Sequence, residues 1–161
     1  MIFKDYKPGT VYPALPLFYE EWDDASSELL FRCDEEVQRI CRALPMFDLS
    51  FVRSLKEHYE SAAPHQLTEK IRSIKAFKGL PTPAAETTGG YIPDLHSRYF
   101  TADFSYGLSV IVQIAQFAGA EVPALKAVLS WYNSIRIETD EFRYADYGIT
   151  DKEAFLKFYS F

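Results

Sequence analysis

The sequence has few cysteines and no recognisable metal-binding pattern. Its two cysteines, Cys33 and Cys41, are eight residues apart on one face of a predicted helix. Their Cα atoms would lie about 12 Å apart, which is too far for a disulfide. We expect both to be reduced thiols in the core of a cytosolic protein. The three histidines and these two thiols show no zinc-binding spacing.

Three further absences narrow the possible partners. No apolar run approaches the roughly 20 residues that cross a bilayer, and residues 1–5 lack the basic start of a signal peptide. The formal net charge of −6 argues against a phosphate-binding basic face. We therefore expect a soluble, cytoplasmic protein that binds neither nucleic acid nor membranes.

A dinucleotide-binding fingerprint is also absent. The one glycine pair, Gly89-Gly90, is not part of a G-x-G-x-x-G turn, and no strand–helix–strand pattern surrounds it. We expect this chain alone to bind no nicotinamide cofactor.

The 161 residues predict one helical domain. With 48% hydrophobic and 16% aromatic residues, the chain can bury a core built largely on aromatic packing. Prolines at positions 8, 13 and 16 exclude a helix near the start. We therefore expect an extended arm over residues 1–22 and a helical core over residues 23–161.

Apolar residues recur with helical spacing in most of that core. A long loop is expected over residues 74–97 and a turn over 138–147, with no strand anywhere. This indicates an all-α domain of five to seven helices with a long central loop. The expected helices cover residues 24–44, 49–60, 67–73, 103–118 and 123–135, and Asp48 is the expected cap of the second. A last helix is expected to begin with a capping box at Thr150 to Glu153 and to extend through Tyr159.

The stretch from Arg98 to Leu108 has the greatest chemical interest. Asp103 is placed to be the N-cap of the following helix, and Gly119 to end it. The guanidinium group of Arg98 can donate two parallel hydrogen bonds to a carboxylate. Together the two residues could bind a zwitterionic or dianionic small molecule. They could equally be a capping aspartate and a surface arginine.

Five segments carry a resemblance to the octopine/nopaline (opine) dehydrogenase family. Residues 98–108 resemble that family's R-Y-x-T-E-D-x-P-Y-G-L segment, and residues 16–20 with 35–40 resemble its entry helix. Residues 74–83 resemble its A-Y-K-G-I-K-A-P-T loop, and residues 119–123 its G-V-P-T-P turn. The similarity runs over nearly the whole chain.

The resemblance implies an orthogonal helical domain like the C-terminal domain of 6-phosphogluconate dehydrogenase. It implies an enzyme that joins an amino acid to a 2-keto acid and reduces the imine with NAD(P)H, held by an N-terminal Rossmann domain. Asp103 would support the catalytic histidine, and Arg98 and Thr101 would bind substrate. Two residues depart from the pattern, Ala102 for glutamate and Ser105 for proline, which puts substrate preference in doubt.

Three interpretations remain open for the chain as a whole. It could be the substrate-binding and dimerisation part of an opine dehydrogenase-like enzyme, inactive by itself and preceded by the Rossmann domain and catalytic histidine. It could be a free-standing small-molecule-binding module, or a helical interaction protein without redox activity. His96 could replace the missing histidine or be a surface residue. We expect a homo-oligomer, through an apolar patch that includes the arm.

Overall fold

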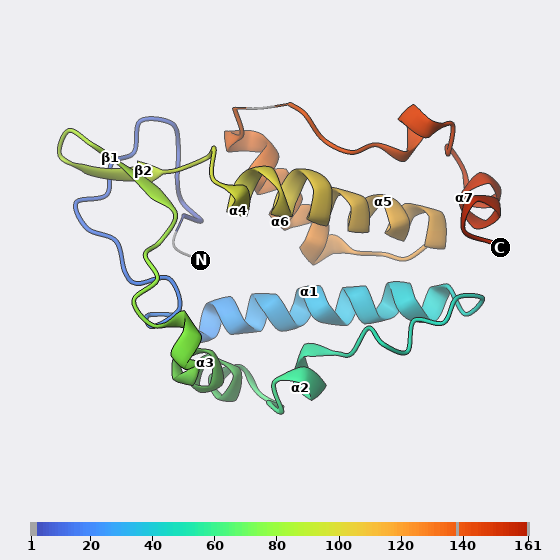
Figure 1. Ribbon diagram of the computed structural model, residues 1–161, viewed down its shortest axis with the longest axis horizontal. Helices are drawn as coiled ribbons and strands as arrows, with labels where there is room; N and C mark the ends of the chain where they lie inside the picture. Colours follow the sequence, from blue (N-terminus) through green and yellow to red (C-terminus); the bar gives the residue numbers. More distant parts are fainter. Residues whose placement is uncertain (1–2, 138, 161) are drawn as a thin grey trace.

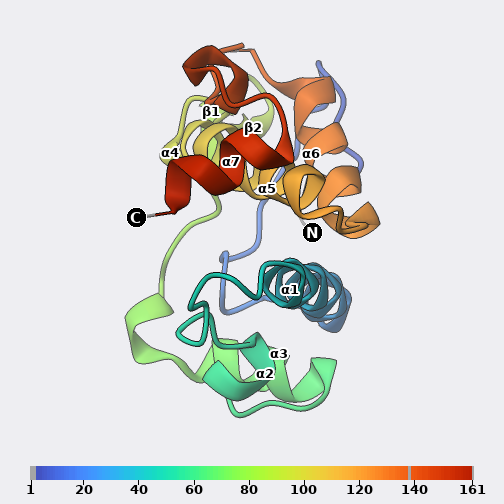
Figure 2. The same cartoon turned by 90° about the vertical axis from the view of Figure 1, so that its right-hand side faces the viewer.

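The computed structural model describes residues 3–137 and 139–160, and its helices form two layers (Figure 1). Helices α1 (Asp24–Ala43), α2 (Leu55–His58) and α3 (Pro64–Ser73) form one layer, and the helices from residue 98 onward form the other (Figures 1 and 2). The remaining helical elements are η1 (Lys75–Phe77), α4 (Arg98–Thr101), η2 (Asp103–Leu108), α5 (Ser109–Ala118), α6 (Pro123–Ile135), η3 (Tyr144–Tyr147) and α7 (Lys152–Tyr159).

Helix α1 is the central element, since it packs against α3 in its own layer and against α5 and α6 in the other. Its first turn is stabilised by Asp23, whose carboxylate accepts a hydrogen bond from the backbone N–H of Ser26 at 2.7 Å. Its apolar face buries Phe31 and Ile40. The sequence predicted this helix within one residue at its C-terminal end.

Helix α6 begins and ends where the sequence predicted. Pro123 occupies its first turn, where a missing N–H costs no hydrogen bond. The buried Glu36 of α1 accepts from the N–H groups of Ala124 and Leu125 at 2.8 and 2.9 Å. A negative charge at a helix N-terminus is favourable, so this carboxylate joins the two layers.

Two hydrophobic clusters involve helices of the second layer, and the larger of them also includes α1. The larger one combines α1, α5, α6 and α7 around buried side chains such as Val112, Leu125 and Phe155. The smaller one is aromatic and brings Phe3 of the arm against Phe100 and Tyr132. The arm is therefore part of the packed domain.

The predicted second helix is wrong in extent, and the third begins earlier than predicted. Asp48 accepts from both the N–H and the hydroxyl of Ser50 and so forms a turn. The helix starts only after Ser54, which forms a reciprocal capping box with Glu57. Helix α3 begins at Pro64, three residues before the predicted start, because proline fits the first helical turn.

A β-hairpin interrupts the region that the sequence predicted as an unstructured loop. Strands β1 (Ala84–Thr87) and β2 (Gly90–Pro93) pair antiparallel, and Tyr12 of the arm forms a bridge to Tyr91. A side chain at Gly90 would collide with the backbone carbonyl of Tyr12. The expectation of no strand was wrong because β1 is mostly exposed and has no apolar alternation.

The central helix begins at Arg98, five residues earlier than predicted. Ser97 is its N-cap residue, so the prediction that Asp103 caps the helix is wrong. Asp103 instead opens a π-helical stretch, η2, that runs directly into α5. Gly119 ends the helix in the left-handed conformation, with φ of 68°, as predicted.

The C-terminal part contains two short helical elements. The predicted turn over 138–147 includes η3, and its first residue, Glu138, lies outside the described residues. Helix α7 is capped by Asp151, which accepts from the N–H of Ala154 at 2.9 Å. The sequence placed this start one residue early, at Thr150. The all-α fold class is confirmed, and within residues 3–137 and 139–160 every helix is too short or too polar to cross a bilayer.

Candidate substrate-binding site

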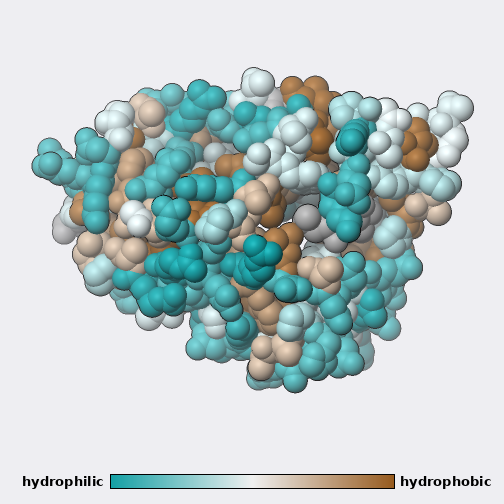
Figure 3. Space-filling model, turned by 180° about the vertical axis from the view of Figure 1, so that it is seen from behind, coloured by the Kyte–Doolittle hydropathy of each residue, from teal (hydrophilic) through white to brown (hydrophobic). Residues whose placement is uncertain are grey.

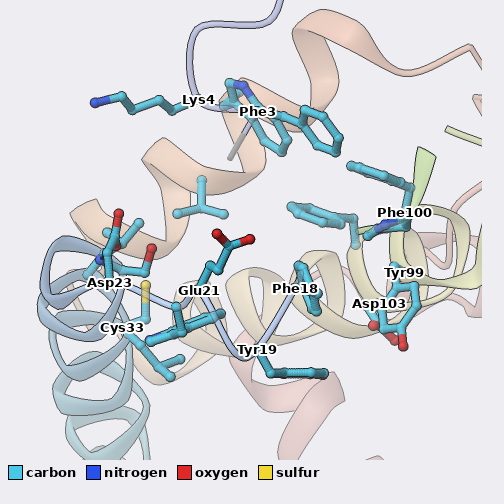
Figure 4. Close-up of a pocket in the computed structure, with 18 residues that line it drawn as sticks. Phe3, Lys4, Phe18, Tyr19, Glu21, Asp23, Cys33, Tyr99, Phe100 and Asp103 are labelled. Atoms are coloured by element: carbon cyan, nitrogen blue, oxygen red, sulfur yellow. Dashed lines mark hydrogen bonds between the residues drawn. The ribbon is translucent and has the colours of Figure 1, made fainter. Parts of the chain in front are cut away.

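A cavity of about 520 Å³ opens between the two layers, beside the arm. Its walls come from the arm, from the first half of α1, from α4 and η2, and from α6 (Figure 4). Figure 3 shows hydrophobic residues gathered around a hollow in one face of the molecule. A concave, largely apolar site with a few polar groups is the usual form of a small-molecule site.

The arm reaches the cavity through a chain of stacked aromatic rings. Tyr19 stacks on Phe77 with ring centroids 4.2 Å apart, and Phe18 contacts the edge of Tyr19 at 4.7 Å. Glu21 follows, and its carboxylate extends toward the middle of the cavity in Figure 4. One of its oxygens accepts from the N–H of Leu17 at 2.6 Å.

Tyr99 and Asp103 form the opposite side of the cavity. They are four residues apart in the helix and therefore share a face, as Figure 4 shows. The residues behind them are held firmly, because Phe104 stacks on Tyr132 at 4.5 Å and the hydroxyls of Ser105 and Tyr132 lie 3.2 Å apart. π-Helical insertions such as η2 occur frequently at functional sites.

The ionisable groups around the cavity differ in their pKa shifts and in whether they already accept hydrogen bonds. Hydrogen bonds from Ser26 lower the pKa of Asp23. Burial raises the pKa of the Cys33 thiol to about 11, so this thiol is uncharged at neutral pH. Burial also raises the pKa of Tyr19, and the nearby Tyr99, Tyr59 and Asp103 add to the effect. Within the described residues, no donor binds the Asp103 carboxylate.

Of the three residues that the sequence singled out, Asp103 alone lines the cavity. Arg98 is exposed and lies outside its walls. The Thr101 hydroxyl donates to the carbonyl of Ser97 at 3.2 Å, so it is bonded to the backbone at the start of its own helix. His96 is exposed and also lies outside the cavity walls.

Sequence reasoning missed several cavity residues. Tyr99 could have been found, because it lies one helical turn before Asp103. Trp131 and Glu21 could not, since their approach to Asp103 depends on how α6 and the arm pack against the central helix.

The described part of the chain contains neither a cluster of metal-ligating side chains nor a parallel sheet. No three metal-ligating side chains cluster within residues 3–137 and 139–160. In the same residues the strands form only an antiparallel hairpin, whereas a dinucleotide site needs a parallel β-α-β unit.

The helical architecture, with a π-helical stretch beside an apolar cavity, defines the class as an all-α domain. Residues 10–136 match the family model for the NAD/NADP octopine/nopaline dehydrogenase alpha-helical domain. The chain belongs to this family, as the sequence resemblance implied.

Individual relatives agree with this assignment. Octopine dehydrogenase from Pecten maximus is 31% identical over 133 residues, which are 76% of this chain and 33% of that protein. Tauropine dehydrogenase from Arabella iricolor is 31% identical over 134 residues, covering 76% and 34%. Vitopine synthase from Allorhizobium ampelinum is 30% identical over 138 residues, covering 86% and 35%.

Solved structures of octopine dehydrogenase have the same fold. The complex with NADH and pyruvate superposes with a TM-score of 0.75 at 27% identity, over 99% of this chain and 44% of that one. The complex with NADH and L-arginine gives 0.74 at 26% identity, over 99% and 46%. This chain therefore spans about a third of the length of its curated relatives and less than half of the solved structures.

Proposed function

We propose that this domain binds the substrates of an NAD(P)H-dependent opine dehydrogenase. In that reaction the amine of an amino acid condenses with the carbonyl of a 2-keto acid, releasing water. Hydride and a proton then convert the imine to a secondary amine. The observation that carries the proposal is the apolar cavity beside Asp103, in a domain of the octopine dehydrogenase family.

The domain would work together with a dinucleotide-binding domain, on the same polypeptide or on another chain. Such a domain would hold NAD(P)H and supply the catalytic histidine. The Asp103 carboxylate would orient that imidazole and favour its charged form, as carboxylates do in acid–base catalysis. Its lack of a donor within the described residues leaves it available for this contact.

Arg98 and Thr101 are both proposed to bind substrate, but the observations behind the two assignments differ. Arg98 is exposed and lies outside the cavity walls, so its guanidinium is open to the keto-acid carboxylate and would bind it as a bidentate donor. Thr101 would contact substrate only by giving up its bond to Ser97. Arg98 is therefore the better anchor of the two.

The test is NADH oxidation with pyruvate and a panel of amino acids. The chain alone should show none, and the chain with its dinucleotide-binding domain should show steady turnover. Activity or NADH binding by the chain alone would contradict the proposal that a separate domain binds the cofactor and supplies the histidine. Ligand binding without turnover in the complete protein would favour a binding module instead.

Variants of the complete protein separate the proposed roles. Asp103→Asn should lower kcat about 100-fold or more through loss of support for the histidine. Arg98→Ala should mainly raise the KM for the keto acid. Asp146→Asn is a matched control, because Asp146 is exposed and lies outside the cavity. Equal losses in all three variants would reject these roles.

Self-association is a separate part of the proposal. Val11 and Leu17 of the arm are 41% and 39% exposed, and apolar patches tend to be covered by a partner. We expect a dimer in sedimentation that Val11→Glu weakens. Met46→Glu, at a 52% exposed position elsewhere, is the control. A clean monomer at high concentration would contradict this part.

A further inference from the structure

The cavity is charged as well as aromatic. Three carboxyl groups line it, those of Glu21, Asp23 and Asp103, together with one ammonium group, that of Lys4. Eight of the eighteen lining residues are aromatic, and the faces of aromatic rings attract cations. Both features favour a ligand that brings positive charge into the cavity. The three carboxylates differ in the bonds that they already make, and this difference decides which of them is open to such a ligand.

Two of the three carboxylates have other partners or roles. The Asp23 carboxylate caps α1 by accepting from the N–H of Ser26 at 2.7 Å. The bonds to Ser26 and, to a smaller degree, the charge of Lys4 lower the pKa of the Asp23 carboxyl. Asp103 lies on the opposite side of the cavity and, under the proposed function, supports the catalytic histidine. Glu21 is the carboxylate that remains.

The packing of the arm directs Glu21 into the cavity. The next residue, Trp22, is held by α3 and α1, because its carbonyl accepts from Nε of Arg72 at 2.7 Å and its indole donates to the Ser27 hydroxyl at 2.9 Å. One Glu21 oxygen accepts from the N–H of Leu17 at 2.6 Å, and no second donor reaches this carboxylate within the described residues. Figure 4 shows the carboxylate pointing toward the middle of the cavity. A side chain held in this way loses little conformational freedom when it binds a ligand.

A carboxylate at this place suits a cation that takes no part in the reaction. The amine that condenses with the keto acid has to lose its proton, whereas a nearby carboxylate favours the protonated form of an amine. Under the proposed function the reaction takes place beside Asp103, on the side of the cavity opposite Glu21. The group that meets Glu21 is therefore a second one, carried by the side chain of the amine substrate.

We propose that Glu21 determines which side-chain charge the site accepts in its amine substrate: it binds a cationic group and excludes an anionic one. The cation lies among the ring faces with the Glu21 carboxylate as its partner, and the reacting amine lies toward Asp103. This role rests on the proposed function, because it concerns the amine substrate of the same site.

The two tryptophans of the chain, Trp22 and Trp131, both line the cavity, so their fluorescence can follow binding. L-Lysine, L-norleucine and L-glutamate are suitable probes, since their side chains are cationic, uncharged and anionic. The full chain is titrated with each at neutral pH and fixed ionic strength. L-Lysine should give a saturable change, with a Kd about tenfold or more below that of L-norleucine. L-Glutamate should bind more weakly than both.

Variants at Glu21 test whether this residue is the cause. Glu21→Gln removes the charge but keeps an oxygen that can accept from the N–H of Leu17. It should raise the Kd for L-lysine about tenfold and change that for L-norleucine less than about twofold. Glu21→Lys should favour L-glutamate over L-lysine. Glu28→Gln makes the same charge change on α1 at an exposed position outside the cavity, and it should alter neither Kd.

The outcomes separate this inference from the proposed function. L-Norleucine or L-glutamate binding as tightly as L-lysine, or no saturable response to L-lysine, would overturn the inference. Equal effects of Glu21→Gln and Glu28→Gln would overturn it as well. Steady NADH oxidation by the complete protein, with pyruvate and with L-glutamate as the preferred amine, would overturn the inference but leave the proposed function standing. Glu21-dependent binding of L-lysine, without turnover of any amine, would do the reverse.

Discussion

Two carboxylates in this domain have opposite environments. Glu36 of α1 is 5% exposed, and both its oxygens accept backbone N–H groups of α6. Asp103 is exposed on the cavity wall and accepts from no donor in the described part of the chain. The fully bonded carboxylate joins the two layers, whereas the unbonded one remains available to a ligand or a catalytic group. Their hydrogen bonds, more than their charge, indicate their roles.

The largest stability effect should follow from Glu36→Gln. The amide would direct an N–H group at a backbone N–H of Ala124 or Leu125, leaving a buried donor unsatisfied. We expect the free energy of unfolding in urea to fall by about 2–3 kcal/mol. Glu28→Gln, at an exposed position of the same helix, should change it by less than about 0.5 kcal/mol. Similar values for both variants would refute the structural role.

The next effect concerns the polar contact behind the cavity. Tyr132→Phe leaves the Ser105 hydroxyl, which is 3% exposed, without its partner at 3.2 Å. We expect a loss of about 1–2 kcal/mol. Adding Ser105→Ala should cost less than it does in the wild-type background, because the pair is already broken. Strictly additive losses in urea denaturation would show that the two hydroxyls do not interact.

A smaller and pH-dependent effect is expected at Asp23. Asp23→Ala removes the cap of α1 and should cost about 1 kcal/mol at neutral pH. The pKa of Asp23 is lowered from 3.8 by the bonds to Ser26. Its stabilising effect is therefore complete above that value and is lost as the pH falls through the lower folded-state pKa. Thermal unfolding of both proteins should show the difference shrinking below about pH 4.

The smallest stability effect should occur at Asp103. Had it capped the central helix, its substitution would cost about 1 kcal/mol. Because that helix begins at Arg98, we expect Asp103→Asn to change the free energy of unfolding by less than about 0.5 kcal/mol. The same variant should strongly reduce turnover of the complete protein. A loss of stability equal to that of Asp23→Ala would mean that Asp103 supports the fold.

The sequence predicted the elements whose signals are local. It also singled out Asp103, which lines the cavity, but for a partly wrong reason. Helices α1 and α6 were found because their apolar periodicity and end signals agree. Asp103 was chosen as a cap as well as a site residue, and the cap assignment failed. No local signal marks a π-helical stretch, so the true helix start at Arg98 was hidden. The hairpin was missed because β1 is mostly exposed.

The family, the helical class and the extents of α1 and α6 were thus determined by the sequence alone, because helical periodicity and motif order are properties of neighbouring residues. The cavity was decided only by tertiary structure. It exists because the arm pairs with the hairpin through Tyr12 and Tyr91, and because Glu36 fixes α6 against α1. These long-range contacts bring Glu21, Asp103 and Trp131 to one site. No spacing along the chain could show that, since distant residues meet only through packing.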